Sequence, residues 1–467
     1  MIFHSLTYLV FLAIVLALYW SLPRRGQNYL LIVGSYIFYG WEHPWFLLPL
    51  WASTLVDYSC ALGMEHFPPR RRLFLVTSIG ASIALLATFK YYGFGLENLN
   101  SVLTHFGEEP IRSSFRLVLP AGLSFYTFQS IGYVVDVYRG RVKAVRNLAD
   151  YALYVTFFPQ LVAGPIERAA HMLPQYRSDR QCDAESWRIG LSLMLWGYFK
   201  KVVVADNTAV IVNKIFALQG MSFPIIWAGV LAFAVQIYAD FSGYTDIARG
   251  TARLLGIDLM VNFNHPYLAS SPVDFWRRWH ISLSTWMRDF IYIPLGGSRC
   301  SAARASFNLI ATFAISGLWH GASWNFVLWG LYWGTLVLIQ RGLEWLGITS
   351  RIPIGCKVAV TFAATCFGWL LFRERQLGQI GHDLAQSPFS ATAEQWRMAA
   401  YFCVLVLIYS LPMVIHLLAT GIPSWRIEAR LSVRSRFLVE TAAAVLLFLG
   451  IVTIRSIATS DFIYFQF

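Results

Sequence analysis

The chain has 467 residues, of which 57% are hydrophobic, 16% are aromatic and 13% are charged. Because soluble domains carry about 25% charged residues, this composition excludes an ordinary soluble protein. It predicts an all-α polytopic membrane protein, whose long helices bond their own backbone in lipid. The net charge of +12 is spread over short loops without a basic tail. This distribution indicates membrane orientation and contact with membrane lipids, and it argues against nucleic-acid binding.

The first apolar segment, Ile2–Leu22, is predicted to be a membrane-spanning helix. It lacks a basic region before it and a small-residue cleavage site after it, so it is a poor signal peptide. Further apolar segments end at Trp41 and at about Leu62, and two more cover Leu73–Tyr92 and Pro120–Tyr138. Basic clusters fall on alternate loops, which predicts an N-terminus outside the cytoplasm by the positive-inside rule.

The segments after residue 150 are irregular. Tyr151–Gly164 has about 14 residues of apolar sequence, which is too short to cross a bilayer and predicts a re-entrant or interfacial helix. Trp187–Phe199 is predicted to be a hydrophobic helix that runs into Lys200 and Lys201.

A polar motif follows the apolar segment Phe223–Tyr238. This motif, IYADFSGYTDIARG at residues 237–250, places Asp240 and Asp246 at or just beyond the predicted end of a membrane helix. Two interpretations are open at this stage. The carboxylates could form a helix-terminal cluster that bonds loop backbone, or they could contact a substrate.

The segment at residues 271–297, SPVDFWRRWHISLSTWMRDFIYIPLGG, predicts an amphipathic helix at the cytoplasmic interface. Ser271 at the N-cap, Pro272 at the first helical position and Asp274 are typical of a helix start. His280 lies on the aromatic face of this helix and is therefore expected to point toward protein or lipid. The simpler interpretation of that face is an aromatic membrane anchor. The polar face carries Arg277, Arg278 and Arg288.

A second histidine, His320, lies in a run of 36 residues, Ala305 to Gln340, that contains no charged side chain. A spanning helix needs only about 20 residues, so one uninterrupted helix is too long. Gly317 and Gly321 flank the histidine and predict a break that divides the run into two half-helices. A titratable group at such a break is a candidate functional residue; the alternative is a structural histidine bonded to a neighbouring carbonyl group.

Three more spanning segments are predicted, at Ile354–Phe372, Met398–Thr420 and Phe437–Ile454. The basic loop that contains Arg426, Arg430, Arg434 and Arg436 is placed inside, which requires residues 373–397 and the C-terminus to lie outside. The total is about eleven spanning helices with two or three partial ones. No linker or repeat divides the chain, so residues 1–467 are predicted to form a single domain.

Several chemistries are excluded by missing motifs, including nucleotide-phosphate binding, zinc hydrolysis and the serine nucleophile elbow. The six cysteines contain no CxxC pair, so neither a metal site nor a disulfide framework is expected. His280 and His320, 40 residues apart, have no adjacent Ser or Cys nucleophile. This arrangement suits general-base catalysis on a bound hydroxyl, with His320 taking the proton as an alcohol attacks an acyl thioester. His280 could orient that base or polarise the carbonyl group, and no covalent acyl-enzyme is expected.

Six segments then carry a family resemblance. They are PAGLSFYTFQSIGYVVDVYRG, FFPQLVAGPIER, IYADFSGYTDIARG, DFWRRWHISLSTWMRDFIYIPLGG, GLWHGASWNFVLWG and FIYFQF. With these segments the chain resembles the membrane-bound O-acyltransferase (MBOAT) superfamily, and most of all its bacterial alginate O-acetylase branch. The resemblance implies a helical ring around a central tunnel, with His320 as the catalytic histidine and His280 as the second family histidine. The region between Phe372 and Met398 is shorter than in the alginate type, which bears on the partner and the polymer.

The resemblance also implies substrates and partners. Acetyl-CoA is the expected donor, no cofactor is bound permanently, and the acetyl group passes across the bacterial inner membrane to an exported SGNH-type acetyltransferase and a polysaccharide acceptor. Alternatives are an MBOAT that acylates a lipid, teichoic acid or peptidoglycan, a transporter, and a scaffold of an export complex. The residues predicted to contact substrate are Trp319, Asn325, Arg277, Arg278, Arg288, Asp240, Tyr244 and Asp246.

Overall fold

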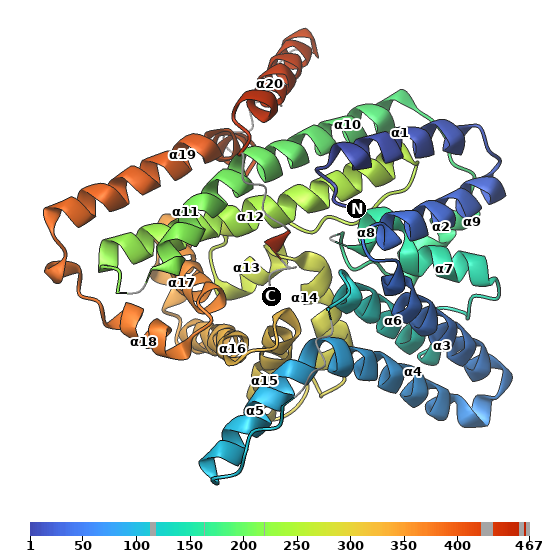
Figure 1. Ribbon diagram of the computed structural model, residues 1–467, viewed down its shortest axis with the longest axis horizontal. Helices are drawn as coiled ribbons and strands as arrows, with labels where there is room; N and C mark the ends of the chain where they lie inside the picture. The colour runs from blue at the N-terminus through green and yellow to red at the C-terminus, as the bar shows by residue number, and fades with distance from the viewer. Residues whose placement is uncertain (113–117, 163, 219, 422–432, 457–461, 464–467) are drawn as a thin grey trace. The chain divides into compact units, whose positions relative to one another are not determined.

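The computed structural model describes residues 1–112, 118–162, 164–218, 220–421, 433–456 and 462–463 (Figure 1). Within these ranges the regular secondary structure is helical, with no β-strand, as the sequence predicts. The contacts divide the chain into two compact units. Unit 1 comprises Met1–Gly190 with Ala248–Met260, and unit 2 comprises Leu191–Ile247 with Val261–Phe467. That the whole chain acts as one domain stays a prediction.

Unit 1 is built from the N-terminal helices. They are α1 (Leu6–Trp20), α2 (Arg24–Gly40), η1 (Pro44–Phe46), α3 (Leu47–His66), η2 (Pro68–Arg70), α4 (Arg71–Leu86), the π-helix η3 (Ala87–Tyr91), α5 (Tyr92–His105), α6 (Leu123–Tyr138), α7 (Leu148–Thr156), α8 (Phe158–Leu161) and α9 (Ala169–Arg177). The short segment at 151–164 forms parts of α7 and α8, and neither helix is long enough to span a bilayer.

The last residues of α12 (Phe223–Leu254) and the segment after it belong to unit 1. Glu167 holds that segment, because its carboxylate accepts a hydrogen bond from the backbone N–H of Met260 at 2.6 Å. Its other oxygen lies 2.8 Å from Nδ1 of His171. Tyr19 donates to the backbone oxygen of Leu255 at 2.8 Å. These contacts give the GPIER motif a structural role within the unit.

Unit 2 contains His280 and His320. Its elements are the end of α10 (Ala184–Tyr198), the π-helix η4 (Phe199–Ala205), α11 (Asp206–Ala217), most of α12, η5 (Pro266–Leu268), α13 (Pro272–Arg278), α14 (Ile281–Met287), the π-helix η6 (Arg288–Tyr292), α15 (Ala302–His320), α16 (Trp324–Trp345), η7 (Thr349–Arg351), α17 (Ile354–Arg373), α18 (Leu377–Ala385), η8 (Pro388–Ser390), α19 (Ala393–Gly421) and α20 (Val433–Thr453).

Helix α12 corrects one prediction. The DFSGYTD motif lies inside this 32-residue helix and not at its end. The helix continues because its polar side chains find partners on η4 and because Gly197 and Gly243 allow α10 and α12 to touch; a Cβ added to Gly197 would lie 2.6 Å from the backbone oxygen of Gly243. In the most apolar 18-residue window of α12, 78% of the residues are buried, so α12 is an interior helix.

The amphipathic segment after Ser271 corrects another prediction. Its start is as expected, since the Ser271 hydroxyl accepts a hydrogen bond from the backbone N–H of Asp274 and Pro272 occupies the first turn. The single predicted helix, however, is broken between α13 and α14 at His280, whose φ of 44° lies in the left-handed region. Side-chain contacts of His280 inside unit 2 stabilise this uncommon backbone conformation, which helical spacing alone does not reveal.

The break beside His320 is confirmed, but only on one side. Helix α15 continues through Gly317 and ends at His320, and Gly321 is its C-cap. Gly317 serves packing instead: a Cβ added there would lie 2.1 Å from the backbone oxygen of Phe326, and one added to Gly330 would lie 2.2 Å from that of Phe313. Helices α15 and α16 therefore form a close antiparallel pair of full helices, and the predicted half-helices are wrong.

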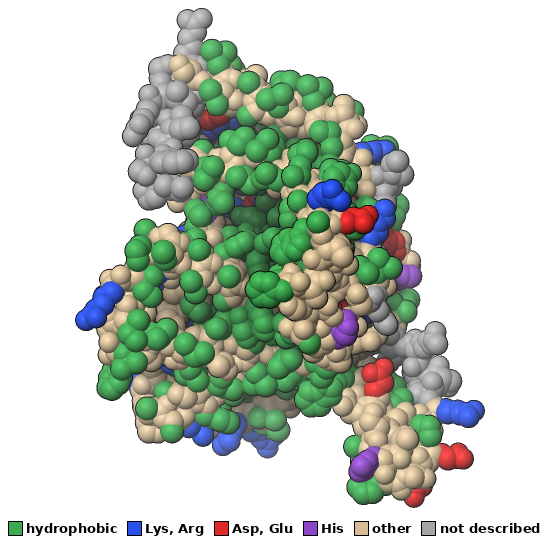
Figure 2. Space-filling view, turned by 90° about the vertical axis from the view of Figure 1, so that its left-hand side faces the viewer, with side chains coloured by type: hydrophobic (Ala, Val, Ile, Leu, Met, Phe, Trp, Pro, Cys, Tyr) green, Lys and Arg blue, Asp and Glu red, His purple; other side chains and the backbone are tan. Residues whose placement is uncertain are grey.

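Six helical stretches within the described residues are long and apolar enough to cross a membrane. They are Pro44–His66, Pro68–His105, Phe223–Leu254, Trp324–Trp345, Ile354–Arg373 and Ala393–Gly421. Shorter apolar helices cover Leu6–Trp20 and Phe437–Thr453. The protein is thus a multi-pass membrane protein, and hydrophobic side chains predominate on the face that Figure 2 shows.

Two expectations fall wholly or partly outside the described residues. Of the predicted basic loop, Arg426 and Arg430 are not described, nor are the side chains of Arg434 and Arg436. Of the terminal DFIYFQF, only residues 462–463 are described.

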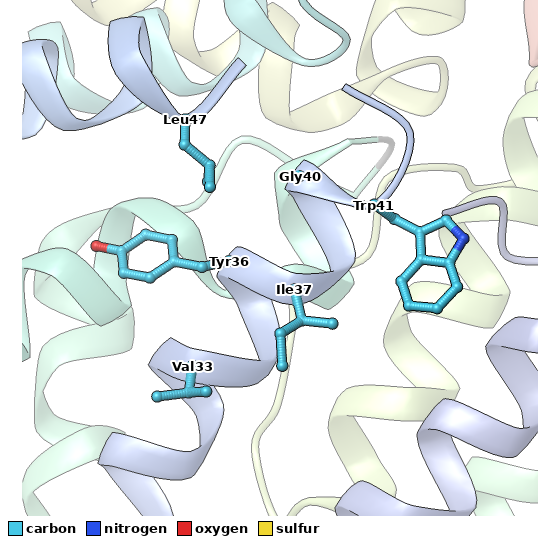
Figure 3. A pocket seen from close by; sticks show the side chains of 6 residues that line it. All are labelled: Val33, Tyr36, Ile37, Gly40, Trp41 and Leu47. Atoms are coloured by element: carbon cyan, nitrogen blue, oxygen red, sulfur yellow. The ribbon is translucent and has the colours of Figure 1, made fainter. Parts of the chain in front are cut away.

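A shallow apolar groove lies on the surface of unit 1 (Figure 3). It is lined by Val33, Tyr36, Ile37, Gly40, Trp41 and Leu47, from α2 to the start of α3. None of the predicted site residues lines it. Its composition is typical of a lipid-facing surface.

Candidate active site

His320 ends α15 and lies in an aromatic wall, which consists of ring side chains from three helices. The ring centroid of His320 is 4.9 Å from that of Trp319 on the same helix, 5.0 Å from Trp329 on α16 and 5.4 Å from Phe372 on α17. Each pair meets edge to face. The residue is 4% exposed. The next residue, Gly321, is required by space, because a Cβ there would lie 2.0 Å from the ring of Phe326.

His280 is fully buried, with 0% exposure, and its imidazole is oriented by Asn262. Asn262 Oδ1 accepts hydrogen bonds from the backbone N–H and the hydroxyl of Ser282, at 3.2 and 2.9 Å. A backbone N–H can only donate, so this atom of Asn262 is the amide oxygen. His280 Nδ1 lies 3.2 Å from the same oxygen and therefore carries the proton. Burial lowers the pKa of His280 to about 3, so the ring is neutral at physiological pH.

The indole of Trp319 contacts both histidines. Its centroid lies 6.1 Å from that of His280 and 4.9 Å from that of His320. Phe241 also contacts His280: its ring meets the imidazole edge to face, with the centroids 4.7 Å apart. The structure thus brings the two histidines, 40 residues apart in sequence, against one side chain.

Asn325 and Trp329 add polar atoms to this aromatic wall. The amide nitrogen of Asn325 donates to the backbone oxygens of Leu371 and Phe372, at 3.2 and 3.4 Å, which ties the start of α16 to the end of α17. The buried Asn325 Oδ1 and Trp329 Nε1 find no hydrogen-bond partner in the described part of the chain. Because buried polar atoms are nearly always bonded, these two atoms are suited to bind a substrate group.

The three arginines predicted to bind the donor lie apart from the buried histidines. Arg277 and Arg288 are exposed. Arg278 pairs with Asp274 at 2.9 Å, and Arg288 pairs with Asp289 at 2.8 Å. The arginines lie at the surface of unit 2, where a phosphorylated molecule can reach them. His280, in contrast, is buried in the interior of the unit.

The carboxylates of the DFSGYTD motif face two buried lysines that sequence reasoning missed. Asp246 Oδ2 lies 2.6 Å from Nζ of Lys200, and Asp240 Oδ1 lies 2.9 Å from Nζ of Lys201. The sequence predicts only that a hydrophobic helix, Trp187–Phe199, runs into these lysines. They lie instead in the π-helix η4, whose wider turn places both of them within reach of α12. Tyr244 lies beside them, with Lys201 Nζ 5.4 Å from its ring centroid.

Within the described residues no group of three or more His, Cys, Asp or Glu side chains has the arrangement of a metal site. The polar groups around His320 are two imidazoles, an indole N–H and an amide oxygen within the aromatic wall. Groups of these types are suited to acid–base chemistry.

Comparison with known proteins agrees with this class. The model of the membrane-bound O-acyltransferase family matches residues 141–363, which include both histidines. The chain is 39% identical, over 84% of its length and 75% of the relative's, to the probable alginate O-acetylase of Pseudomonas aeruginosa. It is 32% identical, over 94% of its length and 91% of the relative's, to the peptidoglycan O-acetyltransferase of Helicobacter pylori.

A more distant relative is the teichoic acid D-alanyltransferase of Bacillus subtilis, which is 26% identical over 56% of this chain and 71% of its own length. The buried histidine site in a multi-pass helical protein and these matches define a membrane-embedded acyltransferase. The chain belongs to the membrane-bound O-acyltransferase family, and it is an O-acyltransferase.

Proposed function

We propose that this enzyme takes an acetyl group from acetyl-CoA and moves it across the membrane for O-acetylation of an exported or cell-envelope polysaccharide, with His320 as general base. The observation that carries the proposal is the position of His320 in the aromatic wall, where Trp319 joins it to an oriented, neutral His280. Two relatives that match most of the chain are named for the O-acetylation of alginate and of peptidoglycan, which are both polysaccharides or contain one.

In the proposed reaction an acceptor hydroxyl gives its proton to the His320 imidazole while its oxygen attacks the thioester carbonyl carbon. The tetrahedral intermediate then expels the thiolate of CoA as the carbon–sulfur bond breaks. The His320 imidazolium returns the proton to that thiolate. The products are the acetyl ester of the acceptor and free CoA thiol. No acyl-enzyme is formed at His320.

His280 serves this reaction by orientation. Because its Nδ1–H is directed at Asn262, its Nε2 has a lone pair and cannot donate a proton to the carbonyl oxygen. The indole N–H of Trp329 is a better donor for the developing oxyanion, since its ring lies against His320 and its nitrogen has no partner in the described residues. The sequence left open whether His280 orients the base or polarises the carbonyl group, and this hydrogen bond favours orientation.

The finer features of the architecture belong to the same proposal. We infer about eleven spanning helices in a ring around a tunnel, in the bacterial inner membrane, with both termini outside. Arg277, Arg278 and Arg288 would meet the phosphates of CoA at the cytoplasmic side. An exported SGNH-type acetyltransferase would receive the acetyl group and pass it to the polysaccharide.

The test is His320→Ala in a cell that makes the cognate polymer. We expect loss of O-acetyl groups from the polymer while the abundance of the protein is unchanged. His105→Ala, at an exposed histidine that ends α5, is the matched control and should leave acetylation intact. Purified protein with labelled acetyl-CoA and a panel of alginate, peptidoglycan and teichoic-acid acceptors identifies the polymer. Normal acetylation in the His320→Ala strain would refute the role of His320.

A further inference from the structure

A second group of buried polar residues lies in unit 2, on η4, α11 and α12. Lys201 Nζ lies 2.9 Å from Oδ1 of Asp206 and 2.9 Å from Oδ1 of Asp240. The side chains of the lysine and the two aspartates are 0%, 1% and 3% exposed. Removing such charges from water is costly, and their mutual attraction seldom does more than offset that cost. The cluster therefore requires a reason beyond stability, and the reaction proposed above does not use it.

Asp240 has a second contact besides the one with Lys201. Asp240 Oδ2 accepts a hydrogen bond from the backbone N–H of Ile463, at 2.6 Å. This contact joins residues 223 positions apart. A carboxylate fixed by Lys201 thus anchors the backbone of residues 462–463 inside unit 2.

The side chain of Phe462 is buried by this anchor, with 0% exposure. Its ring centroid lies 4.5 Å from that of Tyr244 and 5.7 Å from that of Phe241, both on α12. Phe241 follows Asp240 in the chain, so the anchoring carboxylate and the ring that receives Phe462 come from adjacent residues.

Phe241 connects Phe462 with His280, because its ring contacts both. The ring of Phe241 also packs edge to face against His280 at 4.7 Å, and His280 in turn lies against Trp319 beside His320. One continuous series of contacts therefore leads from the Asp240 carboxylate through Phe462 and Phe241 to the imidazole of His280.

We propose that Asp240 is a positioning residue: held by Lys201, it fixes the Phe462-Ile463 dipeptide against Phe241, and thereby holds His280 and Trp319 in the geometry that acetyl transfer needs. The inference rests on the proposed function for the reaction that it serves. It assigns a role to the motif DFSGYTD that is neither a helix cap nor a contact with substrate.

The chain offers a matched control for this role. Asp206 and Asp240 are equally buried and lie at the same distance from Lys201, so a purely electrostatic role predicts the same effect for Asp206→Asn and Asp240→Asn. Each asparagine variant leaves Lys201 with one carboxylate, which limits the loss of stability. The positioning role predicts that only Asp240→Asn releases the dipeptide and disturbs His280.

The first experiment measures the anchor directly. Ile463→Cys is introduced into a full-length protein whose six native cysteines are replaced by serine or alanine, and the rate of labelling by a membrane-permeable maleimide is followed. Position 463 is buried, so labelling should be slow. We expect Asp240→Asn to accelerate labelling by about tenfold or more, which corresponds to a decrease of about 1.4 kcal/mol in the free energy of local opening. Asp206→Asn should leave the labelling rate within about twofold of the rate without it. Equal acceleration in both variants would overturn the anchor, whatever the substrate of the enzyme is.

The second experiment measures the consequence, with labelled acetyl-CoA and the acceptor that the wild-type enzyme uses. Asp240→Asn and Phe462→Leu should each lower kcat on the order of 10-fold or more and leave KM for acetyl-CoA within about twofold, because a small displacement of a catalytic group affects the chemical step. Their effects should not add in the double variant, since both release the same contact. A wild-type enzyme that cannot use acetyl-CoA would contradict the proposed function. An active wild type with equal kcat in the Asp206→Asn and Asp240→Asn variants would contradict the positioning role alone.

Discussion

Alanine at Gly317 tests whether close packing of α15 on α16 sets the position of His320. The added Cβ would lie 2.1 Å from the backbone oxygen of Phe326. Carbon and oxygen atoms pack at about 3.3 Å or more, so the two helices must separate locally by about 1 Å. Overpacking of this kind lowers the free energy of unfolding by about 1–3 kcal/mol. His320 follows Gly317 by less than one helical turn, about 4.5 Å along the axis, so the displacement reaches the imidazole.

Misplacement of a catalytic group by about 1 Å lowers rates by up to about 100-fold. We therefore expect Gly317→Ala to lower both the thermal midpoint in detergent, followed by tryptophan fluorescence, and acetyl transfer from labelled acetyl-CoA. Gly342→Ala is the control on α16, because no atom lies within 4 Å of an added Cβ there and helix propensity predicts a gain of up to about 1 kcal/mol. A Gly317→Ala protein as stable and as active as Gly342→Ala would refute the reasoning.

Two further predictions concern the histidines. Asn262→Ala removes the acceptor that orients His280 and should lower kcat at unchanged protein abundance; a kcat equal to that of the wild type would show that the tautomer is set elsewhere. The hydrogen bond to Glu167 raises the pKa of His171, so its charged form stabilises unit 1 below the unfolded value and this contribution is lost as the pH rises through the folded value. His171→Gln should thus lower the thermal midpoint more at about pH 5.5 than at about pH 9, and an equal decrease at both would contradict the assignment.

Local signals in the sequence were sufficient for part of this structure. The N-cap at Ser271, the helix end at Gly321 and the burial of His280 follow from residue types and spacing that act over a few positions. The family membership followed from ordered motifs and is confirmed by the relatives.

Features that depend on distant partners could not be predicted in this way. The continuation of α12 through Asp240 and Asp246 requires the lysines of η4, about 40 positions earlier. A local hydropathy pattern ends the helix at the first carboxylate, because it does not include these distant lysines. The break at His280 depends on Asn262, 18 residues away, which helical spacing within the segment cannot reveal.

Gly317 shows a different limit of sequence reasoning. A glycine inside a helix predicts a weak point from propensity alone, whereas here the missing Cβ makes room for the backbone of Phe326. The same residue therefore marks a close helix contact and not a break, and only the neighbouring helix distinguishes the two.

The pairing of η4 with α12 also has a consequence for biosynthesis. A carboxylate at the centre of an inserting helix costs about 2.5–3.5 kcal/mol, and α12 carries two that are paired with lysines in the finished protein. Lys200 and Lys201 are synthesised before Asp240 and Asp246. Their ammonium groups are therefore available to pair with the carboxylates of α12 as soon as this helix leaves the ribosome. The helices from α10 to α12 would then enter the bilayer together, with the carboxylates already paired with the lysines. Ion pairing would thus be part of membrane insertion.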